Sequence, residues 1–318
     1  MGADPRARRD AAAERVGIAY AVAAYALWGA FPLFFPLLKP AGPVEILAQR
    51  IVWSLVAVAV VLAAARNASG LAAVLRDRRR MLLLTIAAAL IAINWGTFIY
   101  AVNSDHVIES SLGYFVTPLV SVAFGVFIFR EHLRPRQLAA LSLGACAVVV
   151  LTLDYGRPPW IALTLALSFG TYGLVKKLAG VGAAESLAVE TLVLLVPAIG
   201  YLVVLEASSG GTFAHHSLGH ALLLVASGPV TAVPLLFFSG AVTRVALTMI
   251  GMLQYIAPVL QFLVGLLLVG EAMPASRWIG FALVWVALAV LSLDGMHAVR
   301  RSRAAGPPEP ALATAPPG

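Results

Sequence analysis

Long apolar runs separated by short polar segments cover most of the chain. A helix needs about 20 mainly apolar residues to cross the hydrocarbon core of a bilayer. Ten stretches fit this pattern: 16–38, 43–65, 81–103, 107–129, 137–153, 159–178, 184–205, 219–240, 244–269 and 277–296. They lack the alternation of apolar and polar positions that marks barrel strands. The pattern therefore predicts an all-α membrane protein with ten transmembrane helices.

Short strings recur along the chain at a constant spacing of 140 residues. Residues 151–154 read Leu-Thr-Leu-Asp, and residues 291–294 read Leu-Ser-Leu-Asp. Internal repeats in an apolar chain are typical of transporters that are built from two related halves. The repeat predicts a first five-helix unit over 16–155 and a second five-helix unit over 156–297.

Composition and charge agree with a lipid environment and orient the chain. Of 318 residues, 61% are hydrophobic and 12% are charged, whereas soluble domains carry about 25% charged residues. With segment 1–15 placed inside, the inner segments hold 18 of the 22 Lys and Arg residues and the outer segments hold three. Positive charge favours the cytoplasmic side, so we expect both termini to lie in the cytoplasm. The Ala- and Pro-rich tail, 298–318, is predicted to be disordered.

The number of spans in each half determines how the two halves are oriented relative to each other. Each half holds five predicted spans, which is an odd number, so the second half must enter the membrane from the opposite side. The sequence therefore predicts two inverted five-helix repeats.

Several other classes of function lack support in the sequence. The net charge of +7 lies in short loops that face anionic lipid, so it does not indicate nucleic-acid binding. Cys146 is the single cysteine, which excludes an intrachain disulfide and a thiolate metal site. His215, His216 and His220 lie in or beside an outer loop without a carboxylate partner, so we expect an ordinary polar loop. Phosphate-binding, metalloprotease and nucleophile-elbow motifs are absent, and we expect no metal, no cofactor and no enzymatic activity.

Polar positions within the spans mark a candidate substrate path. The fourth span carries a polar stripe on one helical face: Ser110, Tyr114, Thr117 and Ser121. At the pseudo-equivalent place, the ninth span carries Gln254 and Gln261, with Tyr255 beside them. Two stripes that coincide under the repeat favour a cavity over simple hydrogen bonding between helices. Pro118 and Pro258 lie on these spans and predict helix kinks.

Spans one, three and six add polar and aromatic candidates to the cavity. Asn94 and Asn103 are nine residues apart and point in opposite directions on a straight helix, while Tyr100 shares a face with Asn103. Trp28 and Tyr172 each precede a glycine, which permits close approach of helices and places a ring near a cavity.

Ionisable residues inside spans are costly in lipid and therefore suggest function. Arg50 and Glu190 lie about two turns into their helices and correspond under the repeat, but inversion places them at different depths, which disfavours a direct ion pair. Arg50 and Glu190 are each candidates for a gate or for proton coupling, and Glu109 is a further candidate for proton coupling. Lys176 is also a coupling or gate candidate; it could attract an anionic substrate or serve only as an orienting cytoplasmic charge. Glu45 and Glu109 lie close to span ends, where snorkelling to the interface also explains them.

Several motifs together resemble the RarD-type proteins of the EamA family, in the drug/metabolite transporter superfamily. They include Ile93-Asn-Trp95, Ala101-Val-Asn103, Glu109-Ser-Ser-Leu-Gly-Tyr-Phe115, Tyr172-Gly-Leu174 and Gln254-Tyr-Ile-Ala-Pro258. The resemblance extends over 16–297 and implies ten helices, two inverted halves and a bacterial inner-membrane permease. Lys176-Lys177 departs from the Arg-Lys that the family often carries there, which keeps the charge but loses bidentate geometry.

These observations predict a secondary-active permease. A small metabolite or drug-like molecule would cross by alternating access through a central cavity lined mainly by spans three, four, eight and nine. The expected partners are this substrate, the lipid bilayer and protons, and a homodimer is left open. The alternatives are a non-transporting membrane sensor or scaffold and an intramembrane enzyme.

Overall fold

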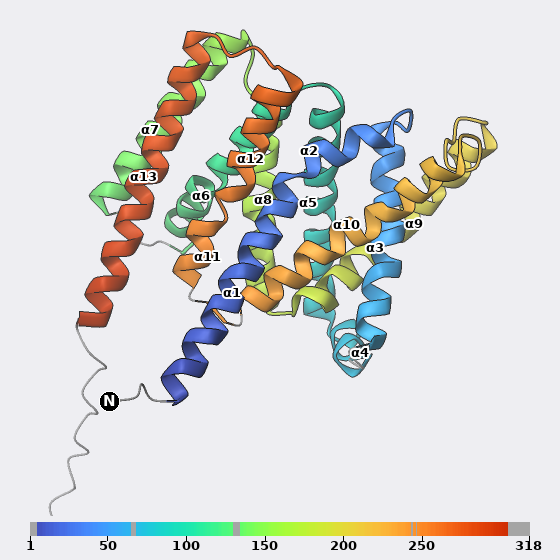
Figure 1. The fold of residues 1–318 in the computed structure, drawn as a ribbon, viewed down its shortest axis with the longest axis horizontal. Helices are drawn as coiled ribbons and strands as arrows, with labels where there is room; N and C mark the ends of the chain where they lie inside the picture. The colour runs from blue at the N-terminus through green and yellow to red at the C-terminus, as the bar shows by residue number, and fades with distance from the viewer. Residues whose placement is uncertain (1–4, 65–67, 130–133, 243, 246, 305–318) are drawn as a thin grey trace, which may run out of the picture.

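The computed structural model describes residues 5–64, 68–129, 134–242, 244–245 and 247–304, and this part of the chain is helical without strands (Figure 1). The elements in chain order are α1 (Pro5–Gly29), α2 (Phe31–Phe34), the 3-10 helix η1 (Phe35–Leu38), α3 (Pro43–Ala64), α4 (Ala68–Arg76), α5 (Arg78–Asn103), α6 (Val107–Phe129), α7 (Pro135–Tyr155), α8 (Trp160–Ala179), α9 (Ala183–Ala207), α10 (Leu218–Val242), α11 (Leu247–Leu253), α12 (Ile256–Val264), the π-helix η2 (Gly265–Val269) and α13 (Ala275–Ala304).

Eight helices of the described chain are long and apolar enough to cross a membrane. They are α3, α5, α6, α7, α8, α9, α10 and α13. A ninth span results if α1 is joined to α2 and η1, which bend away from it by 41° directly after Gly29. The count of ten spans stays a prediction.

The predicted span 244–269 is not one continuous helix, which corrects the expectation from the apolar run. α11 ends at Leu253 and α12 begins at Ile256. Pro258 has no N–H group to donate to the carbonyl of Gln254 four residues earlier, so the helical ladder is interrupted there. Pro118, in contrast, lies inside α6 without interrupting it.

Helix packing divides the molecule into a bundle and a flanking pair. In Figure 1, α7 and α13 run side by side at the left edge, and they pack against each other extensively. The bundle is built from contacts of α3 with α9 and α10, of α8 with α5 and α6, and of α1 with α10 and α12. α6 and α12 complete it. α6 contacts α13 directly, and the ring of Phe262 on α12 packs against the rings of Trp278 and Phe281 on α13.

Ion pairs join the flanking helices α7 and α13 at both ends. Arg134 at the start of α7 binds Asp294 near the end of α13, with 2.9 Å between Nη1 and Oδ2. Arg277 in the first turn of α13 binds Asp154 at the end of α7, with 3.0 Å between Nε and Oδ2. The two aspartates are the last residues of the repeated strings in the sequence. The crossed pairing requires that α7 and α13 run antiparallel.

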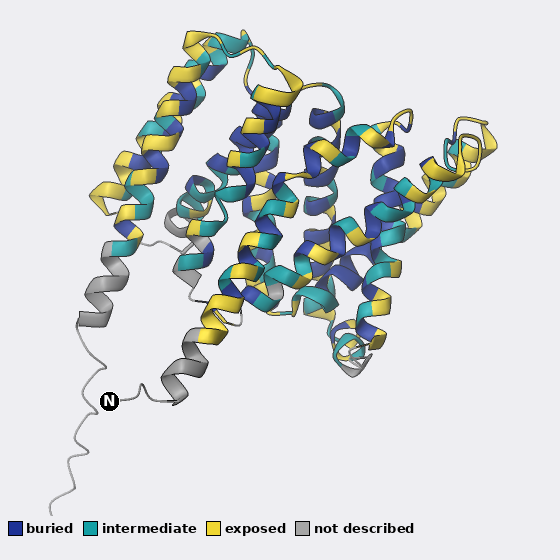
Figure 2. Ribbon diagram, viewed as in Figure 1, coloured by how far each residue is buried: buried dark blue, intermediate teal, exposed yellow. Residues whose placement is uncertain are grey.

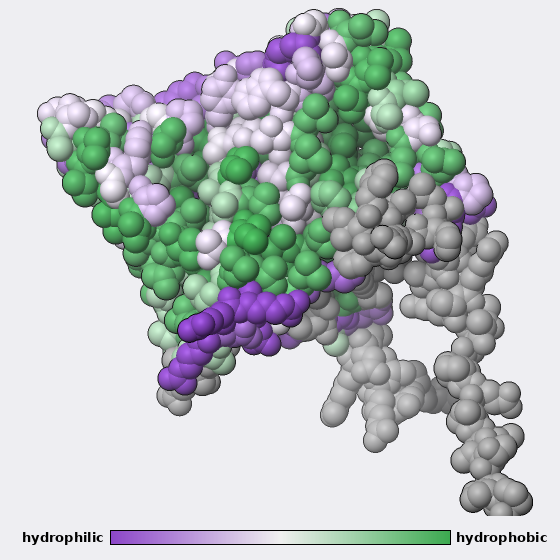
Figure 3. Space-filling model, turned by 180° about the vertical axis from the view of Figure 1, so that it is seen from behind, coloured by the Kyte–Doolittle hydropathy of each residue, from purple (hydrophilic) through white to green (hydrophobic). Residues whose placement is uncertain are grey.

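The outward surface is apolar, as a lipid environment requires. Leu153 and Val196 are 77% and 78% exposed, and Figure 2 shows further exposed residues along α13 and the outer parts of α9 and α10. Figure 3 shows a broad hydrophobic belt bordered by hydrophilic atoms along the lower edge and much of the upper edge. The protein is therefore a multi-pass membrane protein.

Candidate functional site

A buried hydrogen-bond network joins three helices in the middle of the bundle. Asn94 of α5 is 1% exposed and donates to the carbonyl of Leu165 at 3.2 Å and to the hydroxyl of Ser168 at 3.1 Å, both on α8. The hydroxyl of Tyr114 on α6 donates to Oδ1 of Asn94 at 3.1 Å. The structure thus brings together two of the predicted cavity residues, Asn94 and Tyr114.

Arg50 of α3 is buried among aromatic rings. Its guanidinium carbon lies 4.1 Å from the ring centre of Trp95, 5.4 Å from that of Phe31 and 5.5 Å from that of Phe35. Its Nε atom donates to the hydroxyl of Thr231 on α10 at 2.8 Å. Such placement over ring faces stabilises a cation that has lost water.

Glu190 forms a separate network with its neighbours on α8 and α9. Lys176 pairs with Glu190 at 3.0 Å, the hydroxyl of Tyr172 donates to Glu190 at 3.1 Å, and Ser186 donates at 2.6 Å. The carboxylate is 1% exposed. In this structure Glu190 is compensated by Lys176, and Arg50 and Glu190 form no ion pair.

Glu45 and Glu109 are buried, which argues against the alternative that they snorkel to the interface. Glu109 is 2% exposed, pairs with Arg157 at 2.9 Å and accepts from the backbone N–H of Ile161 at 3.1 Å. Glu45 is 3% exposed and accepts from the N–H and the hydroxyl of Thr212. Each carboxylate has found a partner far away in the sequence.

A charged cavity of about 380 Å³ opens at the predicted outer end, where α6, α7, η2 and α13 meet. Its lining residues are Asp105, His106, Glu109, Tyr155, Arg157, Val269, Gly270, Glu271, Ala272 and Arg277. Glu271 corresponds to Glu131 at the repeat spacing of 140 residues, and Glu131 lies outside the described residues. The carboxylate of Glu271 accepts from the backbone N–H groups of Val107 and Ile108 at the start of α6. Burial raises the pKa of Glu271 to about 7.

The other members of the predicted stripe on α6 bond within their own helix. Ser110 donates to the carbonyl of Val107 at 2.7 Å, Thr117 to that of Gly113 at 3.0 Å, and Ser121 to that of Thr117 at 3.2 Å. These hydroxyls therefore donate to carbonyls of their own helix, whereas Tyr114 donates to Asn94 on another helix.

The remaining candidates divide between the bundle centre and its rim. Gln261 of α12 donates to the backbone carbonyl of Trp28 at 3.2 Å, and Gln254 and Tyr255 lie half-buried at the break between α11 and α12. At the rim, Tyr100 is 41% exposed and packs against the ring of Trp160. Near it, the side-chain amide atoms of Asn103 are buried and have no partner in the part of the chain that the structure describes.

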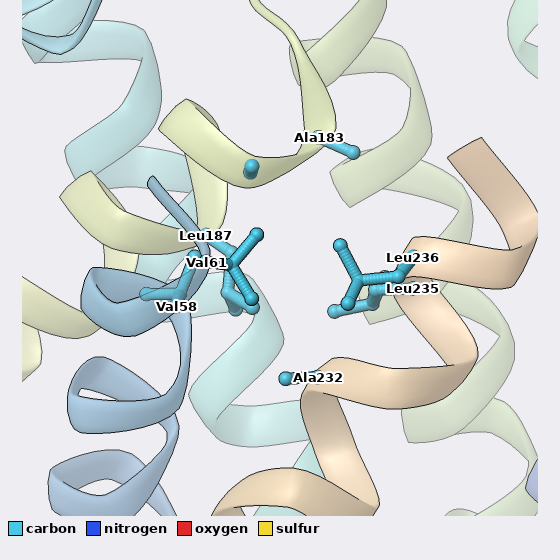
Figure 4. Close-up of a pocket in the computed structure, with 8 residues that line it drawn as sticks. Val58, Val61, Ala183, Leu187, Ala232, Leu235 and Leu236 are labelled. Carbon is cyan, nitrogen blue, oxygen red and sulfur yellow. The ribbon is translucent and has the colours of Figure 1, made fainter. Parts of the chain in front are cut away.

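Apolar side chains close the bundle at the opposite, predicted inner end. Figure 4 shows a small gap between α3, α9 and α10, with Val61 and Leu187 on one side and Leu235 and Leu236 on the other. The space measures about 10 Å³, and every labelled side chain is hydrocarbon. This volume accommodates about one water, and an apolar lining offers that water no hydrogen bonds.

The histidine loop has carboxylate partners, contrary to the expectation from sequence. Nδ1 of His215 lies 3.0 Å from Glu206, and His220 shares Thr212 with Glu45. Among the described residues, no group of three or more His, Cys, Asp or Glu side chains could hold a metal ion.

Comparison with known proteins agrees with the fold and the motifs. The EamA-like transporter family matches residues 15–153. A protein RarD of Streptomyces exfoliatus is 53% identical over 92% of this chain and 92% of its own, and an uncharacterized transporter of Pseudomonas aeruginosa is 40% identical over 90% and 96%. A crystal structure with 22% identity aligns with 87% of this chain and 97% of its own at a TM-score of 0.57, which shows a similar fold. The chain therefore belongs to the EamA-like transporter family as a RarD-type protein, and it is a membrane transporter.

Proposed function

We propose that this protein is a secondary-active permease of the bacterial inner membrane and not an enzyme. It moves a small organic molecule by alternating access between two inverted five-helix halves, with both termini in the cytoplasm. One half comprises α1 to α7, and the other comprises α8 to α13. The substrate path runs between the halves, past Asn94, Tyr114 and Arg50.

The pattern of helix contacts supports two related halves. Under the repeat, α5 corresponds to α10, α6 to α12, and α8 to α1. The contact of α5 with α8 therefore corresponds to that of α10 with α1, and the contact of α6 with α8 to that of α12 with α1; both pairs of contacts are present. Likewise, the contact of α3 with α10 corresponds to that of α9 with α5. The pairs α3–α9, α6–α12 and α7–α13 map onto themselves, as contacts on a pseudo-two-fold axis do.

The observation that carries the proposal is the contact between two broken helices, at the bend that follows α1 and within α12. Gly29 ends α1 directly before the bend, and a Cβ atom there would lie 2.7 Å from Cβ of Leu260 on α12. One residue earlier, the carbonyl of Trp28 accepts from Gln261 on α12. Secondary transporters build their substrate sites from discontinuous helices of both halves near the bilayer midplane. This contact therefore supports a midplane site between α1 and α12.

The two ends of the bundle support a conformation that is closed on one side. At the predicted inner end, apolar side chains of α3, α9 and α10 surround a gap of only about 10 Å³, whereas the predicted outer end holds the charged cavity of about 380 Å³. Alternating access requires that the inner contacts separate while the outer cavity closes.

Uptake by the purified protein in liposomes tests this function. Vesicles are exposed to a mixture of metabolites and antibiotics, and their contents are compared by mass spectrometry with those of protein-free vesicles. We expect uptake of at least one compound, with loss of uptake in Tyr114→Ala and Gln254→Ala at unchanged yield of folded protein. Val196→Ala, on the lipid-facing surface, is the matched control and should retain uptake. Binding of a compound without its uptake would contradict transport and favour a sensor.

Proton coupling is the finer part of the proposal. Glu109 and Glu190 are buried carboxylates near opposite ends of the bundle, each beside one cation. We expect an imposed pH gradient to accelerate uptake, and Glu109→Gln or Glu190→Gln to abolish this acceleration. Uptake by the wild type that is indifferent to the gradient would overturn proton coupling and leave the transport function intact.

A further inference from the structure

Arg50 is a buried cation without a carboxylate partner. Arg50 is 3% exposed. Among the described residues, no Asp or Glu side chain lies within ion-pair distance of its guanidinium. Its Nη1 atom is buried and has no hydrogen-bond acceptor among the described residues. By contrast, Lys176 and Arg157 lie beside buried carboxylates and are neutralised, because Lys176 pairs with Glu190 and Arg157 pairs with Glu109. A charge left unpaired inside a membrane protein is costly and marks a functional site.

Side chains from several helices hold the guanidinium in place. The hydroxyl of Thr231 on α10 accepts a hydrogen bond from Nε of Arg50, and the guanidinium lies over the ring of Trp95 on α5. Phe31 of α2 and Phe35 of η1 cover it from the side of the broken first span. The elements α3, α5, α10 and η1 pack together at this point (Figure 1). Arg50 is therefore fixed at the junction of the two halves, and its Nη1 group has no acceptor among the described residues.

The walls around Arg50 are aromatic. The rings of Phe31 and Phe35 lie 5.6 Å apart, and Phe98 lies 6.0 Å from Phe35 and 5.8 Å from Tyr114. Such rings bury large apolar surfaces and pack well against apolar ligands. The ligand that this environment fits combines one anionic group with a hydrophobic body.

We propose that Arg50 binds the carboxylate of a hydrophobic organic monocarboxylate, which is the substrate class of this transporter; this inference rests on the proposed function. The planar guanidinium presents paired N–H donors that match a carboxylate. One negative charge neutralises the unpaired guanidinium of Arg50, whereas a phosphate dianion would leave an excess charge among aromatic rings. In the present conformation the rings fill the space above Arg50, so entry of the ligand displaces Phe31 and Phe35 on the short segment that follows the bend.

Thermal unfolding of the detergent-purified protein tests the proposal, because a ligand of the folded state raises the apparent Tm. The probes are benzoate, phenylacetate and hexanoate, each compared with its alcohol: benzyl alcohol, 2-phenylethanol and hexanol. We expect the carboxylates to raise the apparent Tm of the wild type more than the alcohols do. The concentration that gives half of the shift should rise at least ten-fold in Arg50→Gln and remain unchanged in Arg134→Gln, which removes an arginine at the far edge of the molecule. Equal shifts by acids and alcohols, or equal shifts in the wild type and Arg50→Gln, would overturn the proposal.

Two further variants protect the test against a folding defect. Arg50→Lys keeps the positive charge and loses the planar fork, and Thr231→Val removes the group that fixes the fork. We expect both to fold, with a weakened response to the carboxylates. An undiminished response in these variants would show that the guanidinium has a structural role only.

The binding test and the liposome experiment fail independently. Carboxylate binding at Arg50 without uptake would retain the site and overturn the transport function. Uptake of a compound that lacks a carboxylate, in a protein that the carboxylate probes do not stabilise, would retain transport and overturn the site.

Discussion

Loss of Arg277 should destabilise the protein far more than loss of Arg134, although the two arginines occupy related places in the two ion pairs of α7 and α13. At the predicted outer end, the side chains of Arg277 and Asp154 are 18% and 6% exposed, and Arg277 also lies 4.4 Å from the ring centre of Tyr155. At the other end, the side chain of Arg134 is 52% exposed, so solvent screens this pair although the side chain of Asp294 is 9% exposed. Removal of one partner from a buried ion pair costs about 3–5 kcal/mol, whereas exposed pairs contribute about 0–1 kcal/mol.

The expected difference between Arg277→Met and Arg134→Met is therefore at least about 2 kcal/mol, or roughly a thirty-fold change in the unfolding equilibrium. Unfolding in mixed micelles with increasing SDS, followed by circular dichroism, measures it. Asp154→Asn should recover most of the stability lost in Arg277→Met, because the neutral amide no longer needs a counter-ion.

Two results would refute this reasoning. Equal losses in Arg277→Met and Arg134→Met would show that burial does not set the strength of these pairs. Absence of recovery in the Asp154→Asn double variant would show that the loss comes from packing against Tyr155 and not from an uncompensated charge.

Three further predictions concern other parts of the molecule. Because burial raises the pKa of Glu271 from 4.5 to about 7, the folded protein keeps a proton between these pH values that the unfolded chain releases. Its stability should fall by about 1–2 kcal/mol as pH rises through this window, after allowance for the partial exposure of the carboxyl, and Glu271→Gln should remove this fall in pH-dependent thermal unfolding. Gly29→Ala should lower the unfolding free energy by about 1–3 kcal/mol, whereas Gly173→Ala, with nothing within 4 Å of the added Cβ, should stabilise α8 by about 0.5–1 kcal/mol; equal effects in SDS titration would contradict the close contact at the bend. Lys176→Met should cost about 3–5 kcal/mol by isolating the buried Glu190, and Glu190→Gln added to it should restore most of the melting temperature.

The apolar runs of the sequence predict most of the helices, because burial in lipid is a property of composition and length. Runs 43–65, 81–103 and 159–178 correspond closely to α3, α5 and α8. Run 244–269 was misleading, because hydropathy does not reveal an interruption in the backbone hydrogen bonds of a helix. Pro258, which lacks an N–H donor, was the signal in the sequence for such an interruption.

The candidate site was predictable in part. Asn94 and Tyr114 stood out as polar residues in apolar helices, and the structure joins them. The burial of Glu109 could not be predicted, because its partner Arg157 lies 48 residues away and sequence position gives only the distance from the span end. The sequence also does not predict that Glu271 accepts hydrogen bonds from the start of α6, because Glu271 and Ile108 are 163 residues apart in the chain.

The hydrocarbon contact among α3, α9 and α10 has a consequence for the energy supply of the cell. Protons cross membranes along files of hydrogen-bonded water, and a gap of about 10 Å³ lined by Val58, Leu187 and Leu236 leaves no room for such a file. At this place the protein therefore offers protons no hydrogen-bonded path, which helps to preserve the gradient that the cell maintains across the membrane.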